Sequence, residues 1–166
     1  MRTTNQAVER VLELRQDFDR GFATAPVSEH AASQDFLAIR LGQKHFALRL
    51  SDIACLLADK TIVRVPGAEA ALLGIAGFRG TVAPVYDLQR LLGEAGAQAP
   101  RWLVVAAAAS VAFAFEAFDG RLRVSPSAIR TQTADTAHGF SKSVLQTESV
   151  VRPIIELSSV LGAIKT

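Results

Sequence analysis

Cysteine is almost absent from this sequence, because Cys55 is the only one in 166 residues. No disulfide can form within the chain, which is typical of a protein that works in a reducing compartment. The excess of one charge over the other is also small, since 18 basic residues balance 16 acidic ones for a net charge of +2. Proteins that grip a phosphate backbone carry a concentrated basic face. No run of lysine and arginine supplies one here, so we expect no nucleic-acid partner.

The sequence also has no apolar run long enough to cross a membrane. Its most apolar window, residues 102–118, is interrupted by Ser110 and Glu116 and is shorter than the roughly 20 residues that a spanning helix needs. The first nine residues lack the apolar core of a secretory signal. We therefore predict a cytoplasmic protein without direct membrane insertion, and its 49% hydrophobic content indicates a packed globular fold.

Residues that could do chemistry are few and scattered. His30, His45 and His138 show none of the spacings that a metal site requires. Cys55 lies among apolar neighbours, which favours a small strand residue over a nucleophile. The glycine-rich segment 74–80 runs into a strand pattern and lacks the Gly-Lys-Ser/Thr of a phosphate-binding loop. We therefore predict that the protein is not an enzyme and holds no metal and no cofactor.

What the sequence does have begins with a helical pattern near its start. The apolar residues of Thr3 to Phe22 fall on one face at helical spacing: Ala7, Val11, Leu14, Phe18 and Phe22. This pattern predicts an amphipathic helix and linker over residues 1–34, followed by a second domain over residues 35–166. The helix either packs on its own domain or docks on a partner, and the residues alone leave both open.

From Asp35 onward the hydrophobic period changes from 3.6 residues to 2. Residues 36–50 and residues 102–117 each predict two strands joined by a tight turn. Many short strands separated by glycine- and proline-bearing turns are typical of sandwiches and small barrels. The predicted fold class is therefore all-β with an N-terminal helix.

An internal repeat is the most informative feature of the sequence. Residues 82–93 and 151–162 both fit V-x-P-[VI]-x-[DE]-L-x-x-[LV]-L-G, and their prolines are 69 residues apart (153 − 84 = 69). The same offset carries Phe46 onto Phe115. Such a repeat indicates one supersecondary unit built twice. A unit of this size buries barely enough apolar surface to be stable alone, so we expect the two units to pack together around a partner-binding groove.

The repeated residues have plain structural explanations. Pro84 and Pro153 cannot donate to a sheet ladder and belong at an edge or a bulge. Asp87 and Glu156 each open a short helical turn, where a carboxylate can cap free N–H groups. Arg79, inside the glycine-rich turn, is either a solvated turn residue or an interface anchor, because arginine is enriched in binding hot spots.

Residues 72–88, LLGIAGFRGTVAPVYDL, resemble the signature of the CheW-like family, the coupling proteins of bacterial chemotaxis. The pattern of that family reads roughly I-x-G-V-x-N-L-R-G-x-V-x-P-V-x-D-L. Further similarity covers residues 62–66, 125–130 and 153–157. The resemblance extends from about Phe36 to Leu161 and leaves out the N-terminal helix.

The resemblance implies two five-stranded Src-homology-like small barrels packed together. It implies a non-catalytic adaptor that is recruited to membrane-associated receptor arrays. Such an adaptor joins the cytoplasmic tips of methyl-accepting chemoreceptors to the regulatory domain of a CheA-type histidine kinase. The receptor's helical hairpin is expected in the groove between the barrels, and the kinase domain at the barrel ends.

The resemblance also implies where these partners bind. Arg79, beside Phe78, matches the arginine of the receptor-binding turn, and Ile53 and Leu103 match apolar positions of the groove. The full set of expected protein-binding residues is Arg79, Ile53, Cys55, Gly77, Phe78, Leu103 and Arg121.

Three residues of this set depart from the family pattern. Cys55 stands where many members carry glutamate, Gly77 where asparagine is usual, and Arg121 where an apolar residue is common. All three lie near the expected partner surfaces. We therefore hypothesise an adaptor of a specialised or accessory chemosensory pathway, such as one that governs surface motility.

The residues leave other functions open. A small barrel could bind nucleic acid through Arg121, Arg123, Arg130 and Trp102, and such binding would weaken steeply with salt. An enzyme with a hidden site is the third possibility, although no convergent set of acid, base or metal ligands supports it. A fragment of the kinase's own regulatory domain is a variant of the adaptor interpretation.

Overall fold

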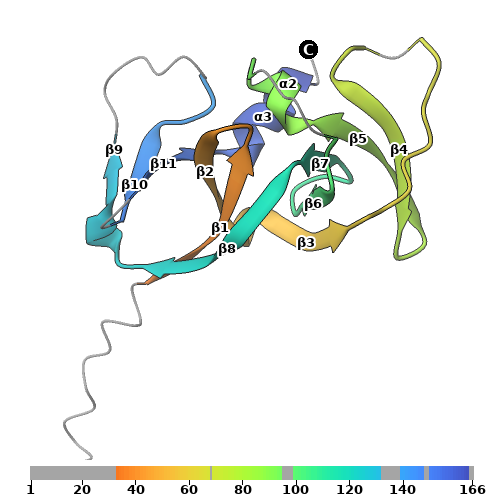
Figure 1. Ribbon diagram of the computed structural model, residues 1–166. Helices are drawn as coiled ribbons and strands as arrows, with labels where there is room; N and C mark the ends of the chain where they lie inside the picture. Colours follow the sequence, from red (N-terminus) through yellow and green to blue (C-terminus); the bar gives the residue numbers. More distant parts are fainter. Residues whose placement is uncertain (1–32, 68, 95–98, 132–138, 148–149, 165–166) are drawn as a thin grey trace, which may run out of the picture. The chain divides into compact units, whose positions relative to one another are not determined.

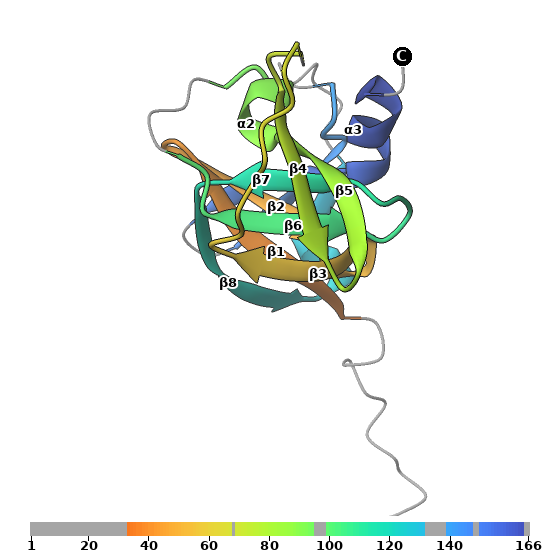
Figure 2. The same ribbon diagram turned by 90° about the vertical axis from the view of Figure 1, so that its right-hand side faces the viewer.

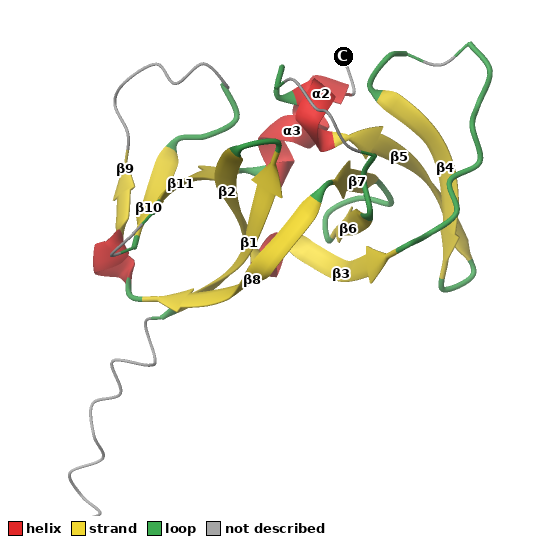
Figure 3. Cartoon of the chain, in the orientation of Figure 1, coloured by secondary structure: helices red, strands yellow, loops and turns green. Residues whose placement is uncertain are grey.

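The structure is a computed structural model that describes residues 33–67, 69–94, 99–131, 139–147 and 150–164. Most of the regular structure in these residues is β, with a few short helices (Figures 1 and 3). The all-β prediction is confirmed for this part of the chain. The helix predicted over Thr3–Phe22, and the linker up to residue 32, lie outside the described residues.

The strands form two sheets that pack on each other. The first sheet runs in the order β8 (Ala117–Val124), β1 (Gln34–Leu41), β2 (Lys44–Arg49), β11 (Val151–Ile155), β10 (Ser143–Gln146) and β9 (Ile129–Thr131). The second sheet runs in the order β3 (Ile53–Ala58), β6 (Trp102–Ala106), β7 (Ala112–Phe115), β5 (Thr81–Asp87) and β4 (Leu72–Phe78). The family resemblance implies five strands in each half, whereas the first sheet has six and the second has five. Both strand orders are open in the described residues, so backbone pairing does not close either sheet into the expected barrel.

The two sheets do not correspond to the two sequence repeats. The hairpin β1–β2 belongs to the first repeat, but it pairs with β8 and β11 of the second. The hairpin β6–β7 belongs to the second repeat, but it pairs with β3 and β5 of the first. Each repeat therefore donates its opening hairpin to the other half, and the parallel pairs β2–β11 and β5–β7 join the halves in equivalent ways.

Strand register corrects one detail of the repeat. Val85 and Ile154, on the closing strands, keep the offset of 69 (154 − 85 = 69). Their parallel partners Ala112 and Ala47 are only 65 residues apart (112 − 47 = 65). The hairpins are displaced by four residues relative to the closing strands, so the equivalence predicted for Phe46 is wrong.

The repeated prolines lie where a closing strand is paired on one side. Pro84 faces β4, and the pairing of β5 with β7 begins one residue later. Pro153 faces β10, and the pairing of β11 with β2 also begins one residue later. The missing proline N–H therefore falls just outside the parallel ladder in both halves. The predicted edge position is wrong, because β5 and β11 are interior strands of their sheets.

The two repeated acidic residues, Asp87 and Glu156, accept different hydrogen bonds. Asp87 caps the short helix α2 (Leu88–Leu91), because its Oδ1 accepts from the backbone N–H groups of Gln89 and Arg90 at 3.0 and 3.3 Å. Glu156, which precedes α3 (Leu157–Ile164), instead accepts from the hydroxyl of Ser159 at 3.4 Å. Capping by the side chain is confirmed at Asp87.

The hydrophobic core fills the junction between the sheets. Its central cluster combines side chains of both hairpins with side chains of α2 and α3, which both lie on the upper side of the sheets in the two views (Figures 1 and 2). The largest fully buried members are Phe46, Phe113, Phe115, Ile39, Leu41, Leu48, Leu88, Ile155 and Leu157. Shared core therefore fills the junction, and hollows lie along its surface.

Candidate functional site

Arg79 occupies a tight turn whose backbone conformation is unusual for a side-chain-bearing residue. Phe78 pairs with Thr81, which leaves Arg79 and Gly80 as a two-residue loop between β4 and β5. Both have positive φ, +48° and +78°, as a type I′ hairpin turn requires. A left-handed conformation costs a non-glycine residue about 1–2 kcal/mol. The turn therefore holds the exposed Arg79 at a defined place on the surface.

The turn borders a hollow of about 420 Å³, which we call the turn hollow. It gathers residues from three separate segments of the second sheet. Its lining residues are Ala54, Cys55, Phe78, Arg79, Thr81 and the run Val105 to Ser110. Three of the predicted site residues, Cys55, Phe78 and Arg79, therefore meet in one place.

The turn hollow combines an apolar floor with a cationic rim. Cys55 and Phe78 are partly buried and pack against an inner cluster of the second sheet that includes Val105. The guanidinium of Arg79 offers up to five N–H donors beside this floor. The arrangement suits an apolar side chain on the floor and an acidic side chain at the rim, which is a recognition surface and not a set of reacting groups.

The remaining predicted residues lie apart from the turn hollow. Leu103 is only 3% exposed and belongs to the inner cluster, so it supports the site from beneath and does not line it. Ile53 is partly buried against the central core. Gly77 is exposed on β4 and Arg121 is exposed on β8 of the other sheet.

An exposed apolar surface covers the outer side of the β4–β5 hairpin, and we call it the outer face. Ile75 and Gly77 of β4 pair with Pro84 and Val82 of β5, and Val63 bridges to Ile75. Val63 and Val82 are 60% and 63% exposed, and Ile75 is 37% exposed. Sequence reasoning missed this surface because alternation alone does not say which face of an end hairpin stays uncovered.

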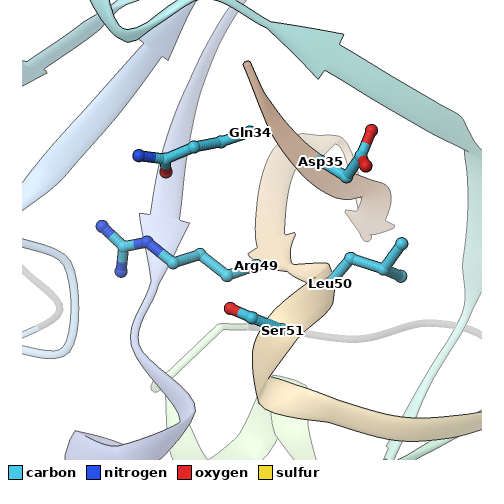
Figure 4. Close-up of a pocket in the computed structure, with 5 residues that line it drawn as sticks. All are labelled: Gln34, Asp35, Arg49, Leu50 and Ser51. Atoms are coloured by element: carbon cyan, nitrogen blue, oxygen red, sulfur yellow. The ribbon is translucent and has the colours of Figure 1, made fainter. Parts of the chain in front are cut away.

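Two further hollows continue from the turn hollow. The seam hollow, of about 150 Å³, lies where the sheets meet and is lined by Ser51, Asp52, Ala106, Ala107, Ala108, Leu157, Ser158 and Leu161. The strand-end hollow, of about 380 Å³, is lined by Gln34, Asp35, Arg49, Leu50 and Ser51 (Figure 4). Residues 106–108 line both the turn and seam hollows, and Ser51 lines both the seam and strand-end hollows. The three hollows are therefore neighbours, with the seam hollow between the other two.

Three of the four residues of the nucleic-acid alternative, Arg121, Arg123 and Trp102, are already engaged within the protein. Arg121 and Arg123 lie 2.8 and 3.3 Å from the carboxylate of Asp35. The hydrogen bond from Arg121, with the positive charge of both arginines, holds the pKa of Asp35 below its usual range. The ring of Trp102 packs edge-on to Phe118 at 5.4 Å and lies under the Arg101 guanidinium. These contacts favour a structural role for this group of residues.

Metal-binding groups and membrane-spanning helices are both absent from the described residues. No group of three or more His, Cys, Asp or Glu side chains is placed to hold a metal ion in that part of the chain. Within the same residues, no helix has both the length and the apolar character needed to cross a membrane.

Comparisons with known proteins indicate both a family and a fold for this chain. The profile of the CheW-like domain family matches residues 35–165. No curated protein matches the sequence. Among solved structures, the scaffolding protein TtCheW from Thermoanaerobacter tengcongensis superposes with a TM-score of 0.67 at 18% identity, over 74% of this chain and 88% of that one. At this identity the superposition supports the fold alone.

Proposed function

The chain belongs to the CheW-like family, whose members are chemotaxis scaffold proteins and not enzymes, and from this premise we propose a specific adaptor role. The protein couples the cytoplasmic tips of methyl-accepting chemoreceptors to the regulatory domain of a CheA-type histidine kinase. It does so from the cytoplasm, where its partners recruit it to membrane-associated receptor arrays. It needs no cofactor, because the work is done by binding.

The observation that carries this proposal is the meeting of Arg79, Phe78 and Cys55 at the turn hollow. A receptor tip is a helical hairpin, and a helix presents an apolar side chain and an acidic one a single turn apart. The apolar side chain would occupy the floor of the hollow, and the acidic side chain would pair with Arg79. The fixed turn conformation reduces the entropy that Arg79 loses on binding.

The residues that depart from the family pattern fit a role in partner choice. Cys55 removes a charge from the floor of the turn hollow, and Gly77 leaves the neighbouring outer face without a polar side chain. Arg121 adds a charge on β8, where it pairs with Asp35. We include these three positions in the proposal as determinants of which receptors and which kinase the adaptor accepts.

The outer face of β4–β5 is the surface proposed for the kinase regulatory domain. It offers three exposed apolar side chains in one patch, Val63, Ile75 and Val82. Exposed apolar patches on soluble proteins mark interaction sites. The turn hollow and the outer face belong to the same hairpin, so the receptor tip and the kinase would be held within one structural unit.

The adaptor proposal is tested by the substitution Arg79→Ala. Losing a desolvated arginine contact costs about 2–5 kcal/mol, which weakens a micromolar complex by roughly thirtyfold or more. We expect calorimetric titration with a soluble chemoreceptor hairpin from the same cell to show this loss. Thermal unfolding should change little, because Arg79 is exposed and lies in the loop between β4 and β5, outside the core.

Arg79→Lys is the matched control, because it keeps the charge and removes the planar fork. We expect it to bind more tightly than the alanine variant and less tightly than the natural protein. Full affinity in Arg79→Ala would rule out this site for the receptor. A much lower unfolding temperature would show instead that Arg79 is structural.

A further inference from the structure

The strand-end hollow holds two donor groups, the Gln34 amide and the Arg49 guanidinium, that donate no hydrogen bond to another side chain within the described residues. Figure 4 shows the polar ends of Gln34 and Arg49 on one side of the hollow, with Asp35 and Leu50 turned the other way. Within the described residues, the nearest acid to the Arg49 guanidinium is Glu156, whose oxygen is 3.9 Å away. That separation is too long for a hydrogen bond. The donors of Arg49 therefore remain available although its side chain is only 29% exposed.

The charges around this hollow favour an anion. Glu156 is shared between Arg49 and Lys142, each 3.9 Å away. Asp35 is likewise shared between two arginines, Arg121 and Arg123. Together with Asp52, which contacts Ser51, three acids are set against four cations around this hollow, which leaves an excess of one positive charge. Ser51 adds no free donor, because its hydroxyl donates to Asp52.

The strand-end hollow is not isolated from the turn hollow. Ser51 links it to the seam hollow, and residues 106–108 link the seam hollow to the turn hollow. Of the eight residues that line the seam hollow, five are alanine or serine, and the other three are Asp52, Leu157 and Leu161. Small side chains let a helix backbone lie close to the surface.

We propose that the strand-end hollow is a carboxylate-binding extension of the receptor site, in which Arg49 and Gln34 hold an acidic side chain of the receptor helix. The inference rests on the proposed adaptor function. The receptor hairpin lies along the three neighbouring hollows, with one acidic residue at Arg79 and a second at Arg49. Guanidinium and carboxylate pair in a bidentate geometry, so Arg49 sets the position of the helix along the surface.

Charge reversal in the full-length protein tests this second anchor. The probe is the same soluble chemoreceptor hairpin used for Arg79. We expect Arg49→Glu to weaken binding at least tenfold in 50 mM salt, and the loss to shrink in 500 mM salt because screening is stronger. Changing the acidic residues of the hairpin to lysine, one at a time, should identify one change that restores affinity to Arg49→Glu alone.

Arg40→Glu is the matched control on the same hairpin. Arg40 is exposed on β1, six residues from Gln34, which places it about 20 Å away along the strand. We expect its reversal to alter affinity by less than about threefold. Arg49→Gln serves as a second variant if the charge reversal lowers the unfolding temperature, and it should weaken binding by about threefold to tenfold.

The outcomes separate this inference from the adaptor proposal. If Arg79→Ala loses binding while Arg49→Glu and Arg49→Gln bind like the natural protein, the second anchor is wrong and the adaptor site stands. If Arg79→Ala binds normally, the proposed receptor site at Arg79 is wrong, and the second anchor is then wrong as well because it is an extension of that site. Equal losses in Arg40→Glu and Arg49→Glu would also overturn the second anchor, because they would show a general charge effect.

Discussion

Gly74 and Gly77 both belong to β4, but the space that a side chain would find differs greatly between the two positions. Gly74 has a φ of +147°, and a Cβ at this position would lie 2.1 Å from the backbone oxygen of Val63. That backbone is held in place, because Val63 and Ile75 exchange hydrogen bonds of 2.8 Å in both directions. A side chain at Gly77 would meet nothing within 4 Å. The close approach at Gly74 brings the loop containing Val63 against β4 and so builds the outer face.

The substitution Gly74→Ala is therefore expected to destabilise the fold by about 3 kcal/mol or more, from backbone strain together with steric overlap. Gly77→Ala, the control, is expected to change stability by less than about 1 kcal/mol. Urea unfolding followed by tryptophan fluorescence measures both. Equal midpoints for the two variants would show that the loop at Val63 moves away freely.

At the residue scale, sequence reasoning succeeded where local geometry decides the outcome. Asp87 was predicted as a cap, and its carboxylate accepts from two backbone N–H groups. Arg79 was placed on a tight turn, which a two-residue loop with positive φ confirms. Leu103 was expected on a groove and is buried, because its exposure depends on strands distant in the sequence.

At the scale of elements, the two closing strands β5 and β11 carry equivalent exposed valines. Val82 and Val151 are related by the offset of 69, and they are 63% and 56% exposed. Val82 is part of the outer face, with Val63 and Ile75 beside it. Among the described residues of its own sheet, no other large apolar side chain is exposed beside Val151.

The substitution Val82→Asp is expected to lower affinity for the purified kinase regulatory domain by at least tenfold, because a charge would be buried in an apolar contact. Val151→Asp, a chemically identical change on the equivalent strand, is expected to have an effect below threefold. Biolayer interferometry with immobilised regulatory domain measures both, and the receptor hairpin should bind the two variants alike. Normal kinase binding by Val82→Asp would place the kinase elsewhere.

At the scale of the whole molecule, the exchange of hairpins makes each sheet depend on both repeats. The second sheet has β6 and β7 between β3 and β5, and both come from the second half of the chain. The first sheet similarly places β1 and β2 between β8 and β11. The central core draws buried side chains from both hairpins and both helices. Neither repeat has the strands to complete a sheet alone.

A chain cut between residues 96 and 97 tests this interdependence. Neither fragment should fold by itself, because each lacks the central strands of one sheet and half of the shared core. Mixing the two fragments should restore the amide resonances of the intact protein in a ¹H–¹⁵N correlation spectrum. A dispersed spectrum from either fragment alone would contradict the exchanged topology.

The sequence by itself determined the strand pattern, the repeat, the capped turn at Asp87, the tight turn at Arg79 and the family. These features depend on side-chain period, on residues with special backbone preferences and on local motifs. Only the tertiary structure decided which half receives each hairpin, that the junction is filled by core, and that the seam hollow lies between the hollows of Arg49 and Arg79. The physical reason is that backbone hydrogen bonds between strands are the same for any pair of sequences, so packing of distant side chains selects the partner.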